Sequence, residues 1–225
     1  MRRYVVVIPA RGGSKRFPDK NIYPLNNKPL ILHSIDCAKG NDHILDIYVS
    51  TDSETIANVA TGYGAKLIQR PYELAGDDAT TAAALQHAAN EMVNCGVAFD
   101  YMILLQPTNP LRPDGLLRNA MEIMDSGQYD SLMTVSPSYM KLGRITEDRF
   151  VPWNYRFGQR TQDLEPLYYE NGLLYISKKE IVLNGSIIGN NMYPMVVDHL
   201  YGTVDIDTID DLRYAEFIIQ QEGYE

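Results

Sequence analysis

The fold is decided by the stretch Tyr4-Val5-Val6-Val7-Ile8-Pro9-Ala10-Arg11-Gly12-Gly13-Ser14-Lys15, in which an apolar run leads directly into a cationic loop. The first five residues are β-branched or aromatic, which is typical of a strand that is buried on both faces. In an open parallel sheet, ligands bind beyond the carboxyl ends of the strands. We therefore expect a ligand site in the loop that follows Ile8.

The loop has the composition of a phosphate site. It continues to Asn21 and carries four cations within ten residues, namely Arg11, Lys15, Arg16 and Lys20. Gly12 and Gly13 let the backbone approach a ligand closely and offer N–H groups to phosphate oxygens, while the cations match the charge. The spacings GxxxxGK[ST] and GxGxxG are both missing, so the loop is neither a P-loop nor a dinucleotide fingerprint. The alternative is a flexible basic surface loop.

Composition limits the class of protein. The chain has 225 residues, of which 45% are hydrophobic and 22% charged, which excludes global disorder and suits one large domain or one domain with an excursion. The formal net charge is −9 and the isoelectric point is near 4.9, so nucleic acid and anionic lipid are not expected partners. Against this background, residues 1–28 hold seven bases and one acid, which marks one anion-binding region on an acidic protein.

Cysteines and apolar runs point to the cytoplasm. Cys37 and Cys95 lie far apart and outside any CxxC pattern, which excludes a disulfide scaffold and a cysteine zinc site and fits a reducing compartment. The apolar runs are too short to span a bilayer. Residues 1–10 faintly resemble a signal peptide, but the run ends at Arg11 without a cleavage pattern.

The rest of the chain alternates between strand-like and helix-like segments. Strands are expected at residues 4–8, 47–49, 65–68, 101–105, 132–135, 173–176 and 195–197. Helices are expected at residues 29–39, 53–60, 79–93, 113–125, 178–183 and 208–220. This order predicts an α/β fold with a mainly parallel central sheet and helices on both faces.

The alternation breaks between residues 137 and 169. This stretch contains three prolines, five bases and several aromatic residues, and it has no helical period. It is either a hairpin-like arm that packs against another subunit or a disordered insert, and the aromatic residues favour the arm. We therefore expect a single domain over residues 1–225 with residues 137–169 as a protruding dimerisation arm.

Five segments, in order, resemble the acylneuraminate cytidylyltransferases, also called CMP-sialic acid synthetases. They are Ile8–Asn21, Ser50-Thr51-Asp52, Arg70-Pro71-Tyr72-Glu73-Leu74-Ala75-Gly76-Asp77, Leu105-Gln106-Pro107-Thr108-Asn109-Pro110-Leu111-Arg112 and Val204-Asp205-Ile206-Asp207-Thr208. The resemblance spans nearly the whole chain. It implies a Rossmann-like three-layer nucleotidyltransferase fold, a homodimer, and transfer of CMP from CTP to a nine-carbon 2-keto sugar acid with release of pyrophosphate.

The resemblance also implies roles for individual residues on the nucleotide side. Displacement at the α-phosphorus needs charge neutralisation and in-line positioning more than a protein nucleophile. The implied catalytic residues are Arg11, Lys20 and Asp207. The implied nucleotide-binding residues are Arg11, Gly12, Gly13, Ser14, Lys15, Lys20, Asn21, Arg70 and Thr81. For Thr81, an ordinary place in a helix is the open alternative.

Asp205 and Asp207 are the implied metal ligands. They alternate in an extended segment, so their side chains are expected on one face. Two carboxylates suit Mg²⁺, a hard cation that takes oxygen ligands and bridges phosphates. A capping or surface role is the alternative for both residues.

The residues that the resemblance implies for binding the sugar acid are Gln106, Asn109, Lys141, Arg160 and Tyr175. Gln106 follows the fourth strand, where a sugar acid meets the nucleotide, and Tyr175 could equally belong to the core. In relatives the arm supplies basic residues across the dimer interface, and Lys141 and Arg160 match best, with Arg156 as a competitor for Arg160.

The segment Tyr169-Glu170-Asn171-Gly172 departs from the RPNG pattern of many bacterial sialic acid enzymes. The missing arginine and the added glutamate change the charge near the sugar, so N-acetylneuraminate, its deaminated analogue KDN and legionaminate-type sugars stay open, with pseudaminate less favoured. Two rival functions are a CMP-KDO synthetase, whose first loop differs, and a non-catalytic cytidine-nucleotide sensor. A hydrolase and a histidine-metal enzyme lack their motifs.

Overall fold

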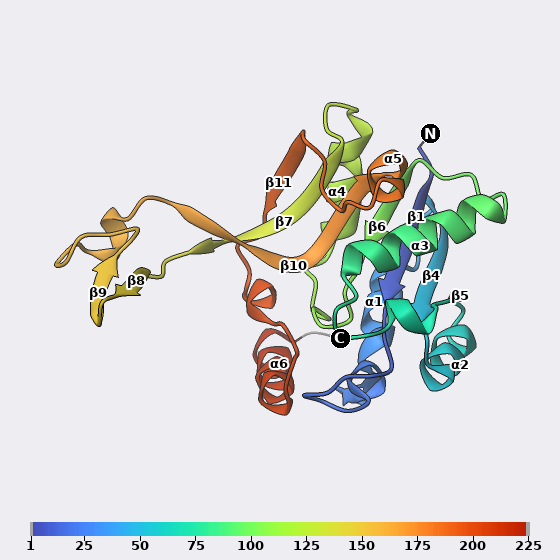
Figure 1. The fold of residues 1–225 in the computed structure, drawn as a ribbon, viewed down its shortest axis with the longest axis horizontal. Coiled ribbons are helices and arrows are strands. Elements are labelled where there is room, and N and C mark those ends of the chain that lie inside the picture. The colour runs from blue at the N-terminus through green and yellow to red at the C-terminus, as the bar shows by residue number, and fades with distance from the viewer. Residues whose placement is uncertain (1, 224–225) are drawn as a thin grey trace.

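The computed structural model describes residues 2–223 (Figure 1). Within these residues, seven strands form one sheet in the order β11-β7-β10-β6-β1-β4-β5. Their bounds are β1 Tyr4–Pro9, β4 Ile44–Thr51, β5 Lys66–Gln69, β6 Tyr101–Leu104, β7 Ser131–Ser138, β10 Leu167–Lys178 and β11 Met192–Val196. Strand β10 runs antiparallel to both of its neighbours, β6 and β7, whereas the other pairs are parallel. The predicted mainly parallel α/β sheet is confirmed.

Helices cover both faces of this sheet, as the alternation of segments predicts. The bounds are α1 Leu30–Ala38, α2 Glu54–Gly62, α3 Thr81–Asn94, α4 Leu116–Asp125, α5 Lys179–Leu183 and α6 Ile209–Glu222. Helices α1, α2 and α4 pack in the apolar cluster on one face, and α3 and α5 pack in the cluster on the other. Helix α6 packs in a third cluster, which includes Leu25, Leu30 and Ile206.

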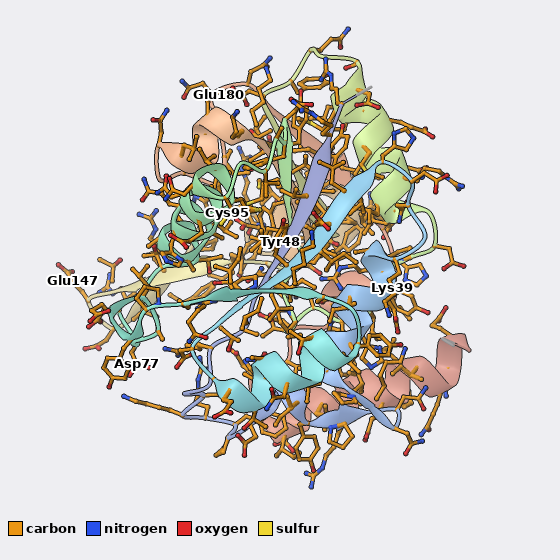
Figure 2. All side chains as sticks on the ribbon, turned by 90° about the vertical axis from the view of Figure 1, so that its right-hand side faces the viewer. Lys39, Tyr48, Asp77, Cys95, Glu147 and Glu180 are labelled. Carbon is orange, nitrogen blue, oxygen red and sulfur yellow. The ribbon has the colours of Figure 1, made fainter. Side chains whose placement is uncertain are left out.

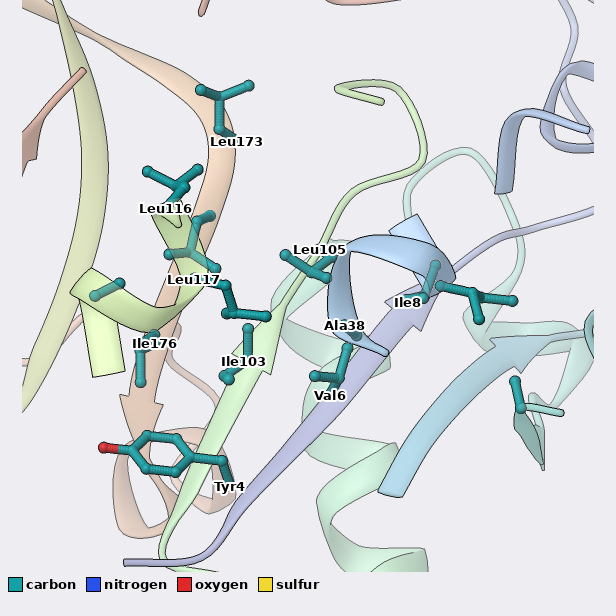
Figure 3. Packing of buried hydrophobic residues seen from close by; sticks show 14 of the residues in the cluster. Tyr4, Val6, Ile8, Ala38, Ile103, Leu105, Leu116, Leu117, Leu173 and Ile176 are labelled. Atoms are coloured by element: carbon teal, nitrogen blue, oxygen red, sulfur yellow. The ribbon is translucent and has the colours of Figure 1, made fainter. Parts of the chain in front are cut away.

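Strand β1 belongs to both cores because alternate side chains of a strand point to opposite faces. Val6 and Ile8 lie in the cluster with α1 and α4, whereas Val5 and Val7 lie in the cluster with α3. All four side chains are fully buried. Figure 3 shows Val6 and Ile8 beside Leu105, in the first of these clusters. The strand that precedes the cationic loop is therefore held rigidly at the centre of the sheet.

Capping side chains explain where three of the six helices described in residues 2–223, α2, α3 and α6, begin. Ser53 accepts a hydrogen bond from the backbone N–H of Ile56 at 3.4 Å and begins α2. Thr208 and Asp211 form a capping box that begins α6 directly after the segment with the two predicted metal ligands. This capping fixes the chain direction at the carboxyl end of the sheet.

Two of the predicted element boundaries were wrong, and one small element was not predicted. Helix α4 begins at Leu116 instead of Pro113, because Gly115 adopts a φ of +74° that a helix cannot contain. Strand β10 begins at Leu167, six residues before the expected start. A small hairpin was not expected at all: β2 (Pro24–Leu25) and β3 (Lys28–Pro29) join through Asn26 and Asn27, which both have positive φ.

The segment between β7 and β10 protrudes from the body of the molecule, at the left of Figure 1. It contains an antiparallel hairpin of β8 (Gly143–Thr146) and β9 (Arg149–Pro152). The expected hairpin-like arm is thus present, and we call residues 137–169 the arm. In the described part of the chain, no helix combines the length and the apolar character that crossing a membrane requires.

Candidate active site

Two adjoining cavities lie at the carboxyl ends of the strands. The first, of about 480 Å³, we call the cationic cavity; it is lined by Pro9, Arg11, Ser14, Lys15, Arg16, Lys20, Asn21, Arg70, Asp77, Ala79, Thr80, Thr81, Ala84, Gln106, Pro107, Thr108 and Asp207. The second, of about 810 Å³, we call the polar cavity; it is lined by Gln106, Thr108, Asn109, Met140, Tyr169, Glu170, Asn171, Gly172, Tyr175, Gly202, Thr203, Asp205 and Asp207. Gln106, Thr108 and Asp207 line both cavities and form the boundary between them.

A hydrogen bond joins the first loop to the residue that follows β4, the strand beside β1 in the sheet. The backbone N–H of Gly12 donates to Asp52 Oδ1 at 2.9 Å. A Cβ at Gly12 would lie 2.9 Å from the Cβ of Ser53, so a side chain does not fit there. A Cβ at Gly13 would meet no atom of residues 2–223 within 4 Å, which leaves room for a ligand. Gly12 and Gly13 themselves are outside the cavity lining and shape the loop.

Each of the four loop cations has a carboxylate partner. Arg11 Nη1 lies 3.0 Å from Asp77 Oδ1, and Lys15 contacts the other oxygen of Asp77. Lys20 Nζ lies 2.8 Å from Asp207 Oδ1, and Arg16 Nη2 lies 3.2 Å from Asp207 Oδ2. The cations are thus gathered in one cavity, where two aspartates offset only half of their four positive charges.

Arg70 and Asn21 line the cationic cavity and form hydrogen bonds with the backbone around it. Arg70 is buried and donates from Nε to Ser50 Oγ at 3.2 Å and from Nη2 to the Ser50 carbonyl at 2.6 Å. Burial lowers the pKa of Arg70, and the nearby Arg11 lowers it further, whereas Asp52 opposes both effects. Asn21 Nδ2 donates to the carbonyl of Arg11 at 2.9 Å. The expected nucleotide residue Thr81 also lines this cavity, at the first turn of α3.

Asp205 and Asp207 both line the polar cavity, as the alternation of the segment predicts. The side chains that alternate with them, Val204 and Ile206, are buried in the core. The pKa of Asp205 lies above its ordinary value, first because the cavity walls partly desolvate its carboxylate and second because Asp207 is close. Two carboxylates that repel each other across a cavity favour a cation between them.

The donor set fits a metal that takes part of its coordination from the substrate. Among residues 2–223, no cluster of three or more histidine, cysteine, aspartate or glutamate side chains could hold a metal ion. Mg²⁺ usually binds through one or two carboxylates, water and substrate phosphates. Asp205 and Asp207 could provide that pair of carboxylates beside the cationic cavity.

A bulge in β10 forms the wall of the polar cavity. The pairing of β10 with β7 shifts register between Glu170 and Tyr175, as is common next to active sites. The Tyr175 hydroxyl donates to Glu170 Oε1, and burial, followed by this contact, raises the pKa of Tyr175. Tyr175 is 95% buried, as a core residue is, and it also lines the cavity; its contact with a substrate stays a prediction. Gln106 lines the boundary with the cationic cavity.

Asn109 shapes the polar cavity from the inside of the protein. Its Nδ2 donates to the carbonyls of Asn171 at 3.2 Å and Val204 at 3.0 Å. Gly172 has a φ of +73°, and a Cβ there would lie 2.6 Å from Asn109 Oδ1. Both amide hydrogens of Asn109 are therefore used to join the bulge to the segment with the two aspartates.

Lys141 and Arg160 are not brought to the two cavities within one chain; neither side chain is among the described residues that line them. Lys141 donates to the carbonyl of Gln159 and lies over the ring of Tyr155 at 5.6 Å. Arg160 pairs with Asp163 through two hydrogen bonds of 2.8 and 3.0 Å. The base of the arm does reach the site, because Met140 lines the polar cavity.

Two charged residues that line the cationic cavity, Arg16 and Asp77, were not predicted as site residues from the sequence. Arg16 was noted as one of the loop cations, and its spacing beside Lys15 is a signal that could have identified it. Asp77 ends the Arg70–Asp77 segment, and Figure 2 shows it on the connection between β5 and α3. Its pairing with the first loop joins positions 66 residues apart and leaves no trace in local sequence.

Comparisons with known proteins agree with this geometry. Residues 5–219 match a family model described as Cytidylyltransferase. The chain is 35% identical over 232 residues to a CMP-N,N'-diacetyllegionaminic acid synthase of Legionella pneumophila, and the alignment covers 97% of each chain. It is 33% identical over 227 residues to an N-acylneuraminate cytidylyltransferase of Streptococcus agalactiae, covering 94% of this chain and 52% of the relative, so it spans about half of that protein.

A solved CMP:2-keto-3-deoxy-manno-octonic acid synthetase complexed with CTP superposes with a TM-score of 0.69 over 98% of this chain and 99% of that one. The two chains are 18% identical, so this likeness shows the fold alone.

Proposed function

The chain belongs to the cytidylyltransferase family, and we propose that it transfers CMP from CTP to the anomeric hydroxyl of a nine-carbon 2-keto-3-deoxy sugar acid, with release of pyrophosphate. It is a nucleotidyltransferase of the acylneuraminate cytidylyltransferase type. The observation that carries the proposal is the pair of adjoining cavities with Asp207 at their boundary. One cavity suits a polyanion, the other suits a polar sugar, and a transferase must bring these two substrates into contact.

The triphosphate of CTP would lie in the cationic cavity, held by Arg11, Lys15 and Lys20. Positive charge there offsets the charge that develops on the leaving pyrophosphate, which is the main requirement of this displacement. The buried Arg70 and Asn21 would keep the loop in shape for the nucleotide, with Thr81 beside them.

Mg²⁺ is the metal that we propose for Asp205 and Asp207. When bound, it would polarise the α-phosphate and lower the pKa of the attacking hydroxyl. Lys20 already holds Asp207 Oδ1 at 2.8 Å, so this carboxylate is oriented toward the boundary between the cavities. Lys20 therefore serves both the phosphate and the position of Asp207.

The sugar acid would occupy the polar cavity against Gln106 and Tyr175. Glu170 contributes a negative charge and Tyr169 stands where the RPNG pattern has arginine, so the wall favours hydrogen-bond donors on the sugar such as hydroxyl or amide N–H groups. N-acetylneuraminate, KDN and legionaminate-type acids all present such groups. The similarity to the Legionella legionaminic acid enzyme makes the last class the first to test.

We further propose a homodimer in which the arm reaches the neighbouring active site. Large apolar side chains of the arm stay exposed in one chain, with Ile145 at 80%, Phe157 at 72% and Trp153 at 60%. Exposed apolar clusters of this kind mark protein interfaces. In such a dimer, Lys141 and Arg160 would meet the carboxylate of the sugar bound to the partner. Residues 1–225 would then act as one nucleotidyltransferase domain with the arm inserted in it.

A cytoplasmic location completes the proposal. CTP is available there, and a reducing environment suits Cys37 and Cys95, neither of which forms a disulfide.

The direct test is pyrophosphate release with CTP and Mg²⁺ in the presence of single sugars. The panel is N-acetylneuraminate, KDN, legionaminate, pseudaminate and the eight-carbon KDO, with ATP, GTP and UTP as nucleotide controls. We expect release that needs both CTP and a nine-carbon acid. Release with KDO alone would assign the eight-carbon reaction instead. CTP binding without release for any sugar would favour a sensor, and failure to bind CTP would exclude the proposal.

A further inference from the structure

We propose that Asp77 is a built-in counter-anion of the triphosphate site, which holds Arg11 and Lys15 in the empty enzyme and is displaced when the nucleotide binds. Its two carboxylate oxygens are divided between the two cations: Oδ1 lies 3.0 Å from Arg11 Nη1, and Oδ2 contacts Lys15. All three side chains line the cationic cavity. The inference rests on the proposed function in taking this cavity as the triphosphate site.

Asp77 is well suited to a contact that must break. Its side chain is 46% exposed and that of Lys15 is 80% exposed, so water can replace either partner at low cost. The hydrogen bond from Lys15 is the largest cause of a lowered pKa at Asp77; burial opposes it, and the charge of Lys15 and the contacts with Arg11 lower the pKa further. Asp77 therefore carries its charge at neutral pH, and that charge repels any polyphosphate in the same cavity.

The geometry indicates that the negative charge of Asp77 mainly competes with the polyphosphate for Arg11 and Lys15. It contributes little to the positions of these two cations. Arg11 Nη1 also donates to the carbonyl of Gly76 at 2.9 Å, so a backbone contact keeps Arg11 oriented when Asp77 is neutral. Lys15 presents a compact charge on a flexible chain and needs no fixed orientation to meet a phosphate. Removal of the Asp77 charge therefore frees two cations without disordering them.

Pyrophosphate release should depend on the same contact. As pyrophosphate leaves the cavity, Asp77 can recover Arg11 and Lys15 and so reduce the attraction that holds the product. The Asp77→Asn enzyme should accordingly show a lower KM for CTP, tighter inhibition by pyrophosphate and a kcat that is equal or reduced. The KM for the sugar should not change, because Asp77 does not line the polar cavity formed by residues 2–223.

The test is calorimetric titration of the full-length protein with inorganic tripolyphosphate, which reports the anion site without the cytosine base. We expect Asp77→Asn to bind about fivefold more tightly than wild type, the scale of two exposed ion pairs. The matched control is Asp78→Asn, which removes the same charge from a neighbouring exposed residue and should leave the affinity within about twofold of wild type. Melting temperatures check that both variants fold.

Three results would overturn the inference: unchanged or weaker binding by Asp77→Asn, an equal gain in Asp78→Asn, or no binding of tripolyphosphate to wild type. A wild-type protein that binds tripolyphosphate but not CTP would instead contradict the proposed function, and the comparison of the two variants would still stand.

Discussion

The cationic cavity and the arm differ in how far contacts within one chain provide partners for their charged side chains and cover their apolar ones. In the cavity, every loop cation has a carboxylate partner, and the backbone N–H of Gly12 donates to the side chain of Asp52, which directly follows β4. On the arm, Lys141 and Arg160 pair within the arm itself, and large apolar side chains face solvent. The comparison teaches that one chain completes the cavity proposed for the nucleotide, whereas the role proposed for the arm toward the sugar needs a second chain.

The largest effect is expected at the boundary between the cavities. Asp207→Ala should reduce turnover roughly a thousandfold or more, because it removes a proposed metal ligand and the partner of Lys20. Pyrophosphate release measures this loss, and circular dichroism shows whether the variant folds. Asp207→Asn keeps an oxygen acceptor for Lys20 and should lose turnover as well.

The control for this variant is Asp210→Ala, which breaks an exposed pair with Arg213 on α6 and should retain nearly the wild-type rate. Near-normal turnover of Asp207→Ala with Mg²⁺ would remove Asp207 from the metal site.

A smaller effect is expected on the arm. The double variant Lys141→Ala, Arg160→Ala should raise the KM for the sugar acid about tenfold, the scale of lost ion pairs with a carboxylate, and leave the KM for CTP unchanged. Steady-state kinetics with each substrate varied in turn separates the two constants. Arg149→Ala, on β9 of the same arm, is the matched control. A rise in the KM for CTP instead would place the arm on the nucleotide side.

The smallest effect is expected far from both cavities, where Arg3 joins β1 to the residue before β6. The side chain of Arg3 donates a hydrogen bond to Asp100 and lowers the pKa of this carboxyl to about 2. Burial of Asp100 opposes the shift, and a hydrogen bond from the backbone N–H of Arg3 adds to it. An acid with a depressed pKa in the fold adds stability above its unfolded pKa of about 4, and this contribution is lost as pH falls toward about 2.

Asp100→Asn should therefore melt below wild type by an amount that is constant from pH 7 to 5 and shrinks below pH 4. Scanning calorimetry at pH 7, 5, 4 and 3 measures the difference. If the difference were the same at every pH, the ion pair would not be its cause. Activity per folded molecule at pH 7 should not change, in contrast to the two variants above.

The sequence predicted the sheet because its central strands are unusually clear. The run Tyr4–Ile8 is buried on both faces as its β-branched residues require, and Ser53 and Thr208 begin their helices where capping residues stand. The hairpin at Pro24–Pro29 was missed because its strands have two residues each, too few to show a period of two. The start of α4 depended on the φ of Gly115, which residue type alone does not fix.

The candidate site was predictable where it follows directly from strand ends. Arg11 lines the cationic cavity because it follows β1 at the carboxyl edge of the sheet, whereas Asp207 reaches the same cavity from the segment that precedes α6. Asp77 could not be placed from the sequence, since its pairing with Arg11 and Lys15 depends on how two distant loops approach each other. The positions of Lys141 and Arg160 depend on a second chain and stay a prediction.

The most direct test of a site divided between two chains is a mixing experiment. An Asp207→Ala chain has a defective cavity and an intact arm, whereas a Lys141→Ala, Arg160→Ala chain has the reverse. At a subsaturating sugar concentration, co-refolded mixtures of the two should recover about one quarter of the wild-type rate, because half of the random dimers pair an intact cavity with an intact arm at one of two sites. A mixed sample no more active than the average of its two parents would contradict the account.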